Sequence, residues 1–382
     1  MNKIPIPSKE VQHAPQRVKL TIFLATLALL AAFKIAGCQK AAGFRARMST
    51  ATDSTNPSPP RAQGHLLTKH ITINGKDRRY AIYIPPALGE SARPLVFELH
   101  GGGVYIEDMT GESGHKTPYK LWMPLADAKK FIVVYPEGLD GAYGSPTWND
   151  CRANASVSST ADDVQFISAL IDDVSSTYHI DPNRIYASGT SNGGIMALRL
   201  AVALYDRIAA VAAIAAAMPD QTECGAPTHA VSILFMNGDK DNHLPYNGGV
   251  ISNPPNPDYG TVFSTEESVH IWTTLNHTDK SPRTYHFPDI SKTDQSHVVR
   301  YTYPRGKENT EVILYKVIGG GHAAPSIAER YSWLYERYFG KQNHDIEMTS
   351  EVWKFFERHP RVPQETLHQQ FTPLVHHQNA SQ

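Results

Sequence analysis

Residues 184–198 read RIYASGTSNGGIMAL, and this stretch decides the fold. The run 184–187 is typical of a strand, and the apolar residues from Ile195 onward have helical spacing. The small residues of Gly189-Thr190-Ser191-Asn192-Gly193 permit a sharp turn that holds a serine in a strained backbone position at its tip. This strand–turn–helix arrangement predicts a nucleophile at Ser191. An ordinary glycine-rich turn between a strand and a helix is the alternative.

The segments on either side repeat the alternation of strand and helix. Short apolar runs predict strands, and apolar residues three or four positions apart predict helices. This alternation predicts an α/β fold with a mostly parallel central sheet and helices on both faces. A hairpin with its turn at Asn74-Gly75 is expected before the first central strand. The expected strands are 68–75, 79–85, 95–99, 131–135, 184–187, 209–217, 231–236, 283–288, 297–303 and 312–318, and the expected helices are 119–130, 161–178, 195–202, 264–275, 325–339 and 346–358.

A glycine run, His100-Gly101-Gly102-Gly103, follows the expected strand 95–99. In acyl transfer the tetrahedral intermediate carries an oxyanion, and backbone N–H groups stabilise it when they are already aimed at it. Glycine lets the backbone come close to such a group. Our interpretation is that the N–H groups of Gly102 and Asn192 form an oxyanion hole. A surface loop without a catalytic role is the alternative.

A histidine and two aspartates complete the candidate site. His322 follows the last expected strand in the run Gly319-Gly320-Gly321-His322, at the sheet edge where open α/β sheets bind ligands. Asp239 and Asp241 both follow the strand 231–236, and either one could supply the acid. The order Ser, Asp, His is that of hydrolases in which an aspartate orients a histidine base and the histidine activates the serine. These residues therefore predict acyl transfer.

The same segments resemble the polyhydroxybutyrate-depolymerase and feruloyl/acetyl-xylan esterase group of α/β-hydrolases (carbohydrate esterase family 1-like). The resemblance covers about 65–360, and it implies an α/β-hydrolase fold and a serine carboxylic-ester hydrolase that needs no cofactor. It selects Asp241 as the acid, because this residue lies four positions before Pro245-Tyr246, and leaves Asp239 as a turn residue. It also makes Trp148 and Tyr246 candidate substrate-binding residues. The segments that carry the resemblance are LHGGG (99–103), VYPEG (134–138), TWN (147–149), ADDVQF (161–166), IDPNRIY (180–186), GTSNGG (189–194), Asp241, PYNGG (245–249), GGH (320–322) and EVWKFF (351–356).

The resemblance implies that the substrate is a polyhydroxyalkanoate-oligomer, feruloyl or acetyl ester. Where the group usually has Gly-Gly-Gly-His-Thr-Trp-Pro, this chain has Ala323-Ala324-Pro325 after the histidine, so an aromatic residue beside the site is missing. We expect no polymer-binding module after residue 360, which favours soluble or small esters over a solid polymer. Two alternatives stay open: a serine peptidase of related fold, and a non-catalytic surface lipoprotein that binds carbohydrate.

The first 38 residues are expected to be a signal peptide. Basic residues precede Leu20, and the largely apolar stretch 20–33 is shorter than a membrane span. The segment ends in Ile35-Ala36-Gly37-Cys38, which resembles a bacterial lipobox and makes Cys38 a candidate for lipidation. A plain signal peptide or a membrane anchor is the alternative. Residues 39–64 are expected to be a flexible Ala/Ser/Thr/Pro linker, 65–360 the esterase domain and 361–382 a disordered tail.

Composition narrows the partners that are expected. The net charge is −1, so no nucleic acid partner is expected. The 18 histidines are scattered, and the chain has no His-Glu-x-x-His or Cys-x-x-Cys run, so no metal site is expected. Cys151 and Cys224 can form one disulfide in an exported protein, or they can remain as two buried thiols. We expect an exported protein, either secreted or held at the cell envelope through a lipid on Cys38.

Overall fold

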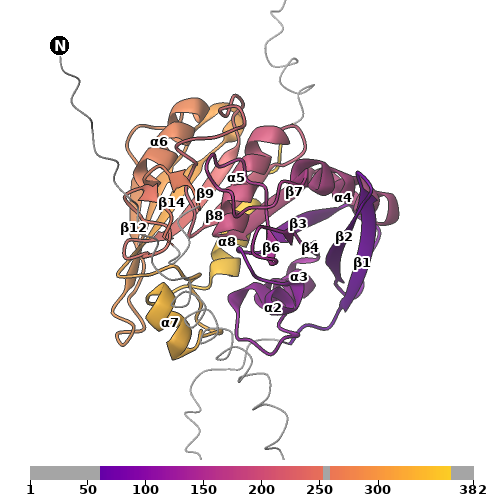
Figure 1. The fold of residues 1–382 in the computed structure, drawn as a ribbon, viewed down its shortest axis with the longest axis horizontal. Coiled ribbons are helices and arrows are strands. Elements are labelled where there is room, and N and C mark those ends of the chain that lie inside the picture. Colours follow the sequence, from indigo (N-terminus) through magenta and orange to yellow (C-terminus); the bar gives the residue numbers. More distant parts are fainter. Residues whose placement is uncertain (1–60, 253–258, 363–382) are drawn as a thin grey trace, which may run out of the picture. The chain divides into compact units, whose positions relative to one another are not determined.

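A computed structural model describes residues 61–252 and 259–362, and a mixed ten-stranded sheet is the centre of this part of the chain (Figure 1). The strands lie in the order β1-β2-β4-β3-β7-β8-β9-β14-β13-β12. Neighbouring strands from β4 to β14 run parallel, and the pairs at the two sides of the sheet run antiparallel. The strands are His65–Ile73 (β1), Lys76–Ile84 (β2), Arg93–Leu99 (β3), Ile132–Pro136 (β4), Ile180–Thr190 (β7), Ala210–Ile214 (β8), Ser232–Gly238 (β9), Arg283–His286 (β12), His297–Tyr303 (β13) and Val312–Ile318 (β14).

Helices cover both faces of this sheet. The α4, α5 and α6 helices pack on one face, where Phe166, Ile195 and Trp272 belong to one buried cluster with alternate strand residues. The α3 and α8 helices pack on the other face, where Trp122 and Phe356 belong to a second cluster. The helices are Ile106–Thr110 (α2), Trp122–Lys129 (α3), Asp163–Thr177 (α4), Asn192–Ala203 (α5), Thr265–Asn276 (α6), Trp333–Phe339 (α7) and Met348–Phe356 (α8), with 3-10 turns at Pro118–Leu121 and Lys307–Asn309.

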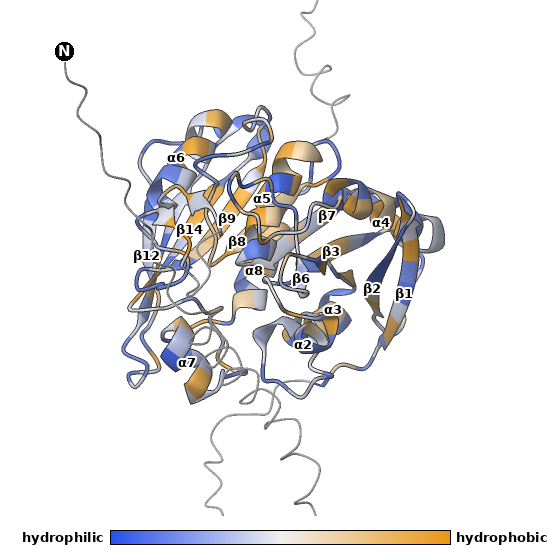
Figure 2. Ribbon diagram, in the orientation of Figure 1, coloured by the Kyte–Doolittle hydropathy of each residue, from blue (hydrophilic) through white to orange (hydrophobic). Residues whose placement is uncertain are grey.

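The central strands consist mostly of apolar residues, and both of their faces are covered. In β3, Phe97 lies in the first cluster and its neighbour Val96 lies in the second. Successive side chains of a strand point to opposite faces, so a strand buried on both sides has no polar alternation. Figure 2 shows the resulting hydrophobic colouring of the central strands. The mostly parallel sheet with helices on both faces confirms the predicted α/β-hydrolase fold.

The hairpin and most helices agree with the expected elements. Asn74 and Gly75 both have positive φ angles, of 52° and 74°, and they join β1 to β2. Short two-stranded sheets form at Leu139–Asp140 (β5) with Pro146–Thr147 (β6), and at Gly249–Val250 (β10) with Thr261–Val262 (β11).

The expected helix over 325–339 is wrong in its first half. Only α7 is helical, and it begins after Ser332, whose side chain accepts a hydrogen bond from the amide of Tyr335. The preceding residues bond to Glu347 instead, because its carboxylate accepts the amides of Ile327 and Ala328. A carboxylate from another segment therefore satisfies backbone groups that a helix would have paired.

Several predictions on the ends of the chain lie outside the described residues. These are the signal peptide 1–38, the lipidation of Cys38, most of the linker 39–64 and nearly all of the tail 361–382. The tail begins with Arg361, whose amide donates to the carbonyl of Asn183. Of the helices in the described part, none is both long enough and apolar enough to span a membrane.

Candidate active site

Ser191 lies on a sharp turn between β7 and α5. Its backbone is in an unusual conformation, with φ 57° and ψ −123°, and its amide donates to the carbonyl of Ile214 on the neighbouring strand. Such a conformation costs free energy and persists only where surrounding contacts enforce it. A Cβ atom at Gly189 would overlap the carbonyl of Gly193, and one at Gly193 would overlap the carbonyl of Leu99. The two glycines therefore allow this turn.

The glycine loop after β3 lies beside the first turn of α5. A Cβ atom placed on Gly102 would lie 3.8 Å from the Cβ atom of Asn192. Asn192 is the first residue of α5, so its amide has no acceptor within the helix. The N–H groups proposed for an oxyanion hole thus come from two adjacent loops, and the positive end of a helix dipole lies next to them.

The side chain of His100 holds the glycine loop in place through hydrogen bonds. The amide of Gly138 donates to its Nε2 atom at 2.9 Å, so Nδ1 carries the ring hydrogen and donates to the carbonyl of Gly101 at 2.7 Å. Burial lowers the pKa of His100 to about 4. The imidazole is therefore neutral at physiological pH, and it holds the loop through one donor and one acceptor.

The side chain of Asn192 is held by the loop 147–152. It accepts from the amide of Trp148 at 2.7 Å, and it donates to the carbonyl of Trp148 at 3.1 Å and to Asp150 Oδ2 at 2.6 Å. A disulfide joins the next residue, Cys151, to Cys224, so the prediction of a disulfide agrees with the structure. The covalent link ties this loop, and with it Asn192, to the segment after β8.

The Asp241 and His322 side chains form a buried hydrogen-bonded pair. His322 Nδ1 lies 2.6 Å from Asp241 Oδ2, and the two side chains are 2% (Asp241) and 8% (His322) exposed. The other oxygen of Asp241 accepts the amides of His243 and Leu244, each at 2.8 Å. Asp239 Oδ1 accepts the amide of Gly319 instead. Asp241 therefore faces the histidine, whereas Asp239 braces the turn that carries it.

One cavity of about 210 Å³ brings most of the candidate residues together. Gly102, Ser191, Asn192 and His322 all line it. The other lining residues include Val157, Ile195 and Ile251, which are apolar, and Arg152, whose guanidinium is paired with Asp150. Ser191, His322, Gly102 and Asn192 thus line the same small volume.

Trp148 and Tyr246, the two candidate substrate-binding residues, do not line this cavity. Trp148 is fully buried, its ring lies against His100, and its indole N–H donates to the carbonyl of His100 at 2.9 Å. Tyr246 is also buried, and Lys316 lies over its ring at 4.4 Å. Both rings pack against neighbouring segments outside this cavity, and direct contact of either residue with the substrate stays a prediction.

A buried carboxyl group lies beneath the glycine loop. Glu98 is fully buried on β3, two positions before His100, and its Oε2 atom accepts the indole N–H of Trp122 at 2.7 Å. Burial raises the pKa of Glu98 to about 8. At neutral pH this group is mostly protonated and uncharged, since a carboxylate there would be poorly solvated.

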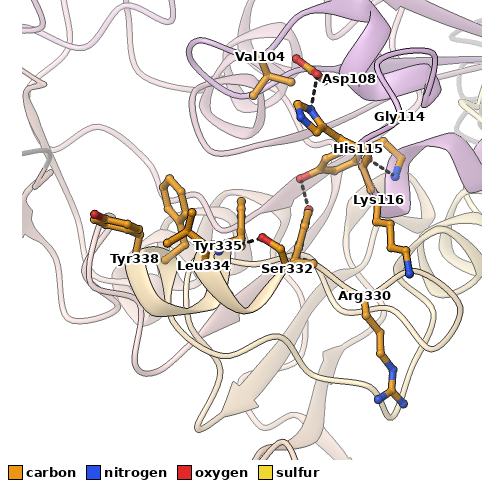
Figure 3. A pocket seen from close by; sticks show the side chains of 14 residues that line it. Val104, Asp108, Gly114, His115, Lys116, Arg330, Ser332, Leu334, Tyr335 and Tyr338 are labelled. Carbon is orange, nitrogen blue, oxygen red and sulfur yellow. Dashed lines mark hydrogen bonds and ion pairs between the residues drawn. The ribbon is translucent and has the colours of Figure 1, made fainter. Parts of the chain in front are cut away.

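A second and larger cavity, of about 840 Å³, adjoins the first (Figure 3). Val104, Tyr119, Tyr335 and Phe339 line both cavities. Half of its lining comes from 104–119, and the other half, from α7 and the segment before it, includes four aromatic residues; none of the lining residues has a predicted role in the site. The sequence does contain a pattern that could have indicated this wall: Tyr331, Tyr335 and Phe339 follow one another at intervals of four positions, as on one face of a helix.

Potential metal ligands do not gather in the described residues. Across 61–252 and 259–362 there is no group of three or more His, Cys, Asp or Glu side chains that could hold a metal ion.

The chain is similar in sequence to known esterases. Residues 78–233 match the family model described as esterase PHB depolymerase. The putative esterase NocK of Nocardia uniformis subsp. tsuyamanensis is 30% identical over 279 residues, which cover 70% of this chain and 76% of that protein. Feruloyl esterase B of Piromyces equi is 30% identical over 62% of this chain and 40% of its own length. The poly(3-hydroxybutyrate) depolymerase of Ralstonia pickettii is 29% identical over 40% of this chain and 31% of its own length. With its sheet order, its glycine-rich turns and these relatives, the chain belongs to the PHB-depolymerase-type esterase family of carboxylic-ester hydrolases.

Proposed function

We propose that the protein hydrolyses carboxylic esters with Ser191 as nucleophile, His322 as base and Asp241 as the acid that orients the base. The observation that carries this proposal is the buried Asp241–His322 pair, whose histidine lines the same cavity as the strained Ser191 turn. Gly102 and Asn192 supply the N–H groups that stabilise the oxyanion. Membership in an esterase family supports the same chemistry.

The reaction proceeds through an acyl-enzyme. His322 Nε2 takes the proton of Ser191 as Oγ attacks the ester carbonyl, and the carbonyl oxygen becomes an oxyanion beside the two N–H groups. His322 then gives this proton to the leaving alcohol. In the second half, His322 takes a proton from water, hydroxide adds to the acyl carbonyl, and Ser191 leaves with the proton that His322 returns.

A fluorophosphonate probe tests the nucleophile directly. The probe phosphonylates a serine only when a neighbouring base activates it, so the folded wild type should be labelled and Ser191→Ala should not. Ser158 lines the same cavity, and within the described residues its hydroxyl has no hydrogen-bond partner, so Ser158→Ala is the matched control and should still be labelled. An unlabelled wild type with an intact fold by circular dichroism would refute the proposal.

The substrate is proposed to be an acetyl, feruloyl or hydroxyalkanoate-oligomer ester. The names of the relatives include feruloyl esterase, acetylxylan esterase and poly(3-hydroxybutyrate) depolymerase, and these names point to the three esters. Activity on p-nitrophenyl acetate, together with no cleavage of p-nitroanilide peptides, would separate an esterase from a peptidase of related fold. Rates on the three ester classes would then rank them.

Export is proposed from two features. The leader 1–38 has the pattern of a signal peptide with a lipobox. The structure also has the disulfide Cys151–Cys224, and disulfides form and persist mainly in oxidising compartments outside the cytosol. Mass spectrometry of the protein from a bacterial host tests the anchor. The expected result is a mature chain that begins with a diacylated Cys38, and Cys38→Ser should release the protein into the soluble fraction. An intact leader would contradict the proposal.

A further inference from the structure

We propose that the 840 Å³ cavity beside the candidate site, called here the aromatic groove, binds the alcohol part of the ester, and that the preferred alcohol has an apolar body and a carboxylate end. The groove is lined by residues of 104–119 and 330–339. This inference rests on the proposed ester hydrolysis, and it adds the chemical class of the leaving group.

The groove adjoins the cavity that contains Ser191. Four residues line both volumes, and the proposal places one ester across the two. A row of rings also links them. Tyr331 stacks on Tyr335 at 4.0 Å between ring centroids, Tyr335 lies 4.5 Å from Phe339, and Phe339 lies 4.6 Å from His243 in the smaller cavity.

The groove lies on the histidine side of the site. The hydroxyl of Tyr335 donates to the carbonyl of His322 at 3.1 Å, and the ring of Phe339 lies 6.1 Å from that of His322. His322 must protonate the leaving oxygen, so the alcohol leaves on the side of the active site where His322 lies. The smaller cavity is also lined by Arg152, Val157 and Ile251, which do not line the groove, and the proposal leaves this part for the acyl group.

The walls of the groove suit an apolar body. Tyr119, Tyr331 and Tyr335 present their rings, and the two outer residues of α7, Leu334 and Tyr338, are 42% and 64% exposed. Large aromatic surface that remains open to solvent gains free energy when a ligand covers it. An alcohol that carries a ring or an alkyl chain would supply that cover.

Two cationic side chains line the groove. Lys116 and Arg330 are exposed, and neither forms an ion pair within the described part of the chain. Figure 3 shows both at the end of the view opposite Tyr338. The acidic lining residue, Asp108, is already bonded to His115 at 2.8 Å. The two cations therefore favour an anion at the end of the alcohol that lies farthest from the ester bond. A hydroxy acid meets this requirement, because its hydroxyl forms the ester and its carboxylate is free.

Matched substrates test the assignment. The acetate esters 4-(acetoxymethyl)benzoate and 4-(acetoxymethyl)benzamide share one leaving oxygen and differ in the charge at its far end. Wild type should hydrolyse the benzoate with a kcat/KM about fivefold higher, as expected for two exposed charge contacts. Added salt should reduce this preference, because exposed charges are screened. The reversed pair, methyl (4-carboxyphenyl)acetate and its amide, carries the charge on the acyl side and should show no such preference.

Variants assign the preference to the groove. The two esters also differ in intrinsic reactivity, which is measured as the ratio of their rates of hydrolysis in alkaline water without enzyme. In the double variant Lys116→Gln/Arg330→Gln, the ratio of kcat/KM on the benzoate to kcat/KM on the benzamide should fall close to this value. Arg337→Gln is the control, because this exposed arginine lies on the same helix but does not line the groove. For the apolar wall, Tyr338→Ala should lower the ratio of rates on benzyl and ethyl acetate, whereas Trp333→Ala, which removes an exposed ring outside the groove, should not.

The outcomes are distinct. A benzoate preference that is absent, that survives the double variant, or that appears only in the reversed pair overturns the proposal. An equal loss in Arg337→Gln would indicate a general effect of net charge and would overturn it as well. If the wild type hydrolyses no ester, including p-nitrophenyl acetate, the proposed function itself fails, and this result differs from an active enzyme without the preference.

Discussion

His322 Nδ1 lies 2.6 Å from Asp241 Oδ2, while Asp239, two positions away in the chain, bonds to the amide of Gly319. This difference gives a paired prediction. Asp241→Asn should lower kcat by about 10³-fold to 10⁴-fold, because an amide no longer holds the histidine in the required tautomer. Steady-state kinetics on p-nitrophenyl acetate would measure the loss.

Asp239→Asn is the matched control for this prediction. An asparagine oxygen can still accept the amide of Gly319, so kcat should stay within about threefold of wild type, in line with the loss of one modest hydrogen bond. A loss in Asp239→Asn as large as that in Asp241→Asn would mean that the acid has been assigned to the wrong residue.

Trp148 supports the glycine loop, and its removal should affect stability before binding. Trp148→Phe keeps a ring in the core but leaves the buried carbonyl of His100 without its donor. We expect the free energy of unfolding to fall by about 1–3 kcal/mol, measured by urea denaturation. KM for a short acetate should change little, since the indole lies outside the cavity. A large rise in KM at unchanged stability would instead indicate that Trp148 contacts the substrate.

The disulfide Cys151–Cys224 closes a loop with a sequence separation of 73 residues. Chain-entropy arguments give a stabilisation of about 4 kcal/mol for a loop of this length. The double variant Cys151→Ser/Cys224→Ser should therefore unfold at a lower denaturant concentration. It should also have a lower kcat, because the loop next to Cys151 holds Asn192 through Trp148 and Asp150. A variant that is less stable but equally active would show that the position of Asn192 does not depend on the disulfide.

Local backbone requirements made part of the site predictable from sequence. A serine between glycines can be recognised because the turn at Ser191 needs small neighbours. Asp241 and Asp239 lie in one turn, so only the resemblance to a family could rank them. The position of Trp148 could not be read at all, because its burial depends on contacts with His100, far away in the chain. The aromatic groove likewise needs α7 to pack beside Tyr119, which no local pattern encodes.

Glu98 should make the protein less stable as the pH rises. Its pKa is about 8 in the folded state and near the ordinary value of 4.5 when unfolded, so the folded protein binds more protons between these values. Stability then falls with pH by up to about 1.4 kcal/mol per pH unit across this window. His100 acts in the opposite sense, since its lowered pKa, about 4 instead of 6.5, makes the unfolded chain bind more protons between pH 4 and 6.5.

Between pH 4.5 and 6.5 the opposite effects of Glu98 and His100 on the free energy of unfolding nearly cancel. The loss of stability due to Glu98 should therefore be seen between pH 6.5 and 8. Glu98→Gln removes the titrating group but keeps an oxygen that can accept the indole N–H of Trp122. Urea unfolding at half-unit pH steps should show stability falling from pH 6.5 to 8 in the wild type and a flatter profile in Glu98→Gln. Asp127→Asn serves as the comparison, because this carboxylate bonds to Tyr83 near the surface, and its variant should retain the wild-type slope. Parallel profiles for wild type and Glu98→Gln would mean that Glu98 is ionised in the folded protein, and another group would have to explain any loss of stability in alkali.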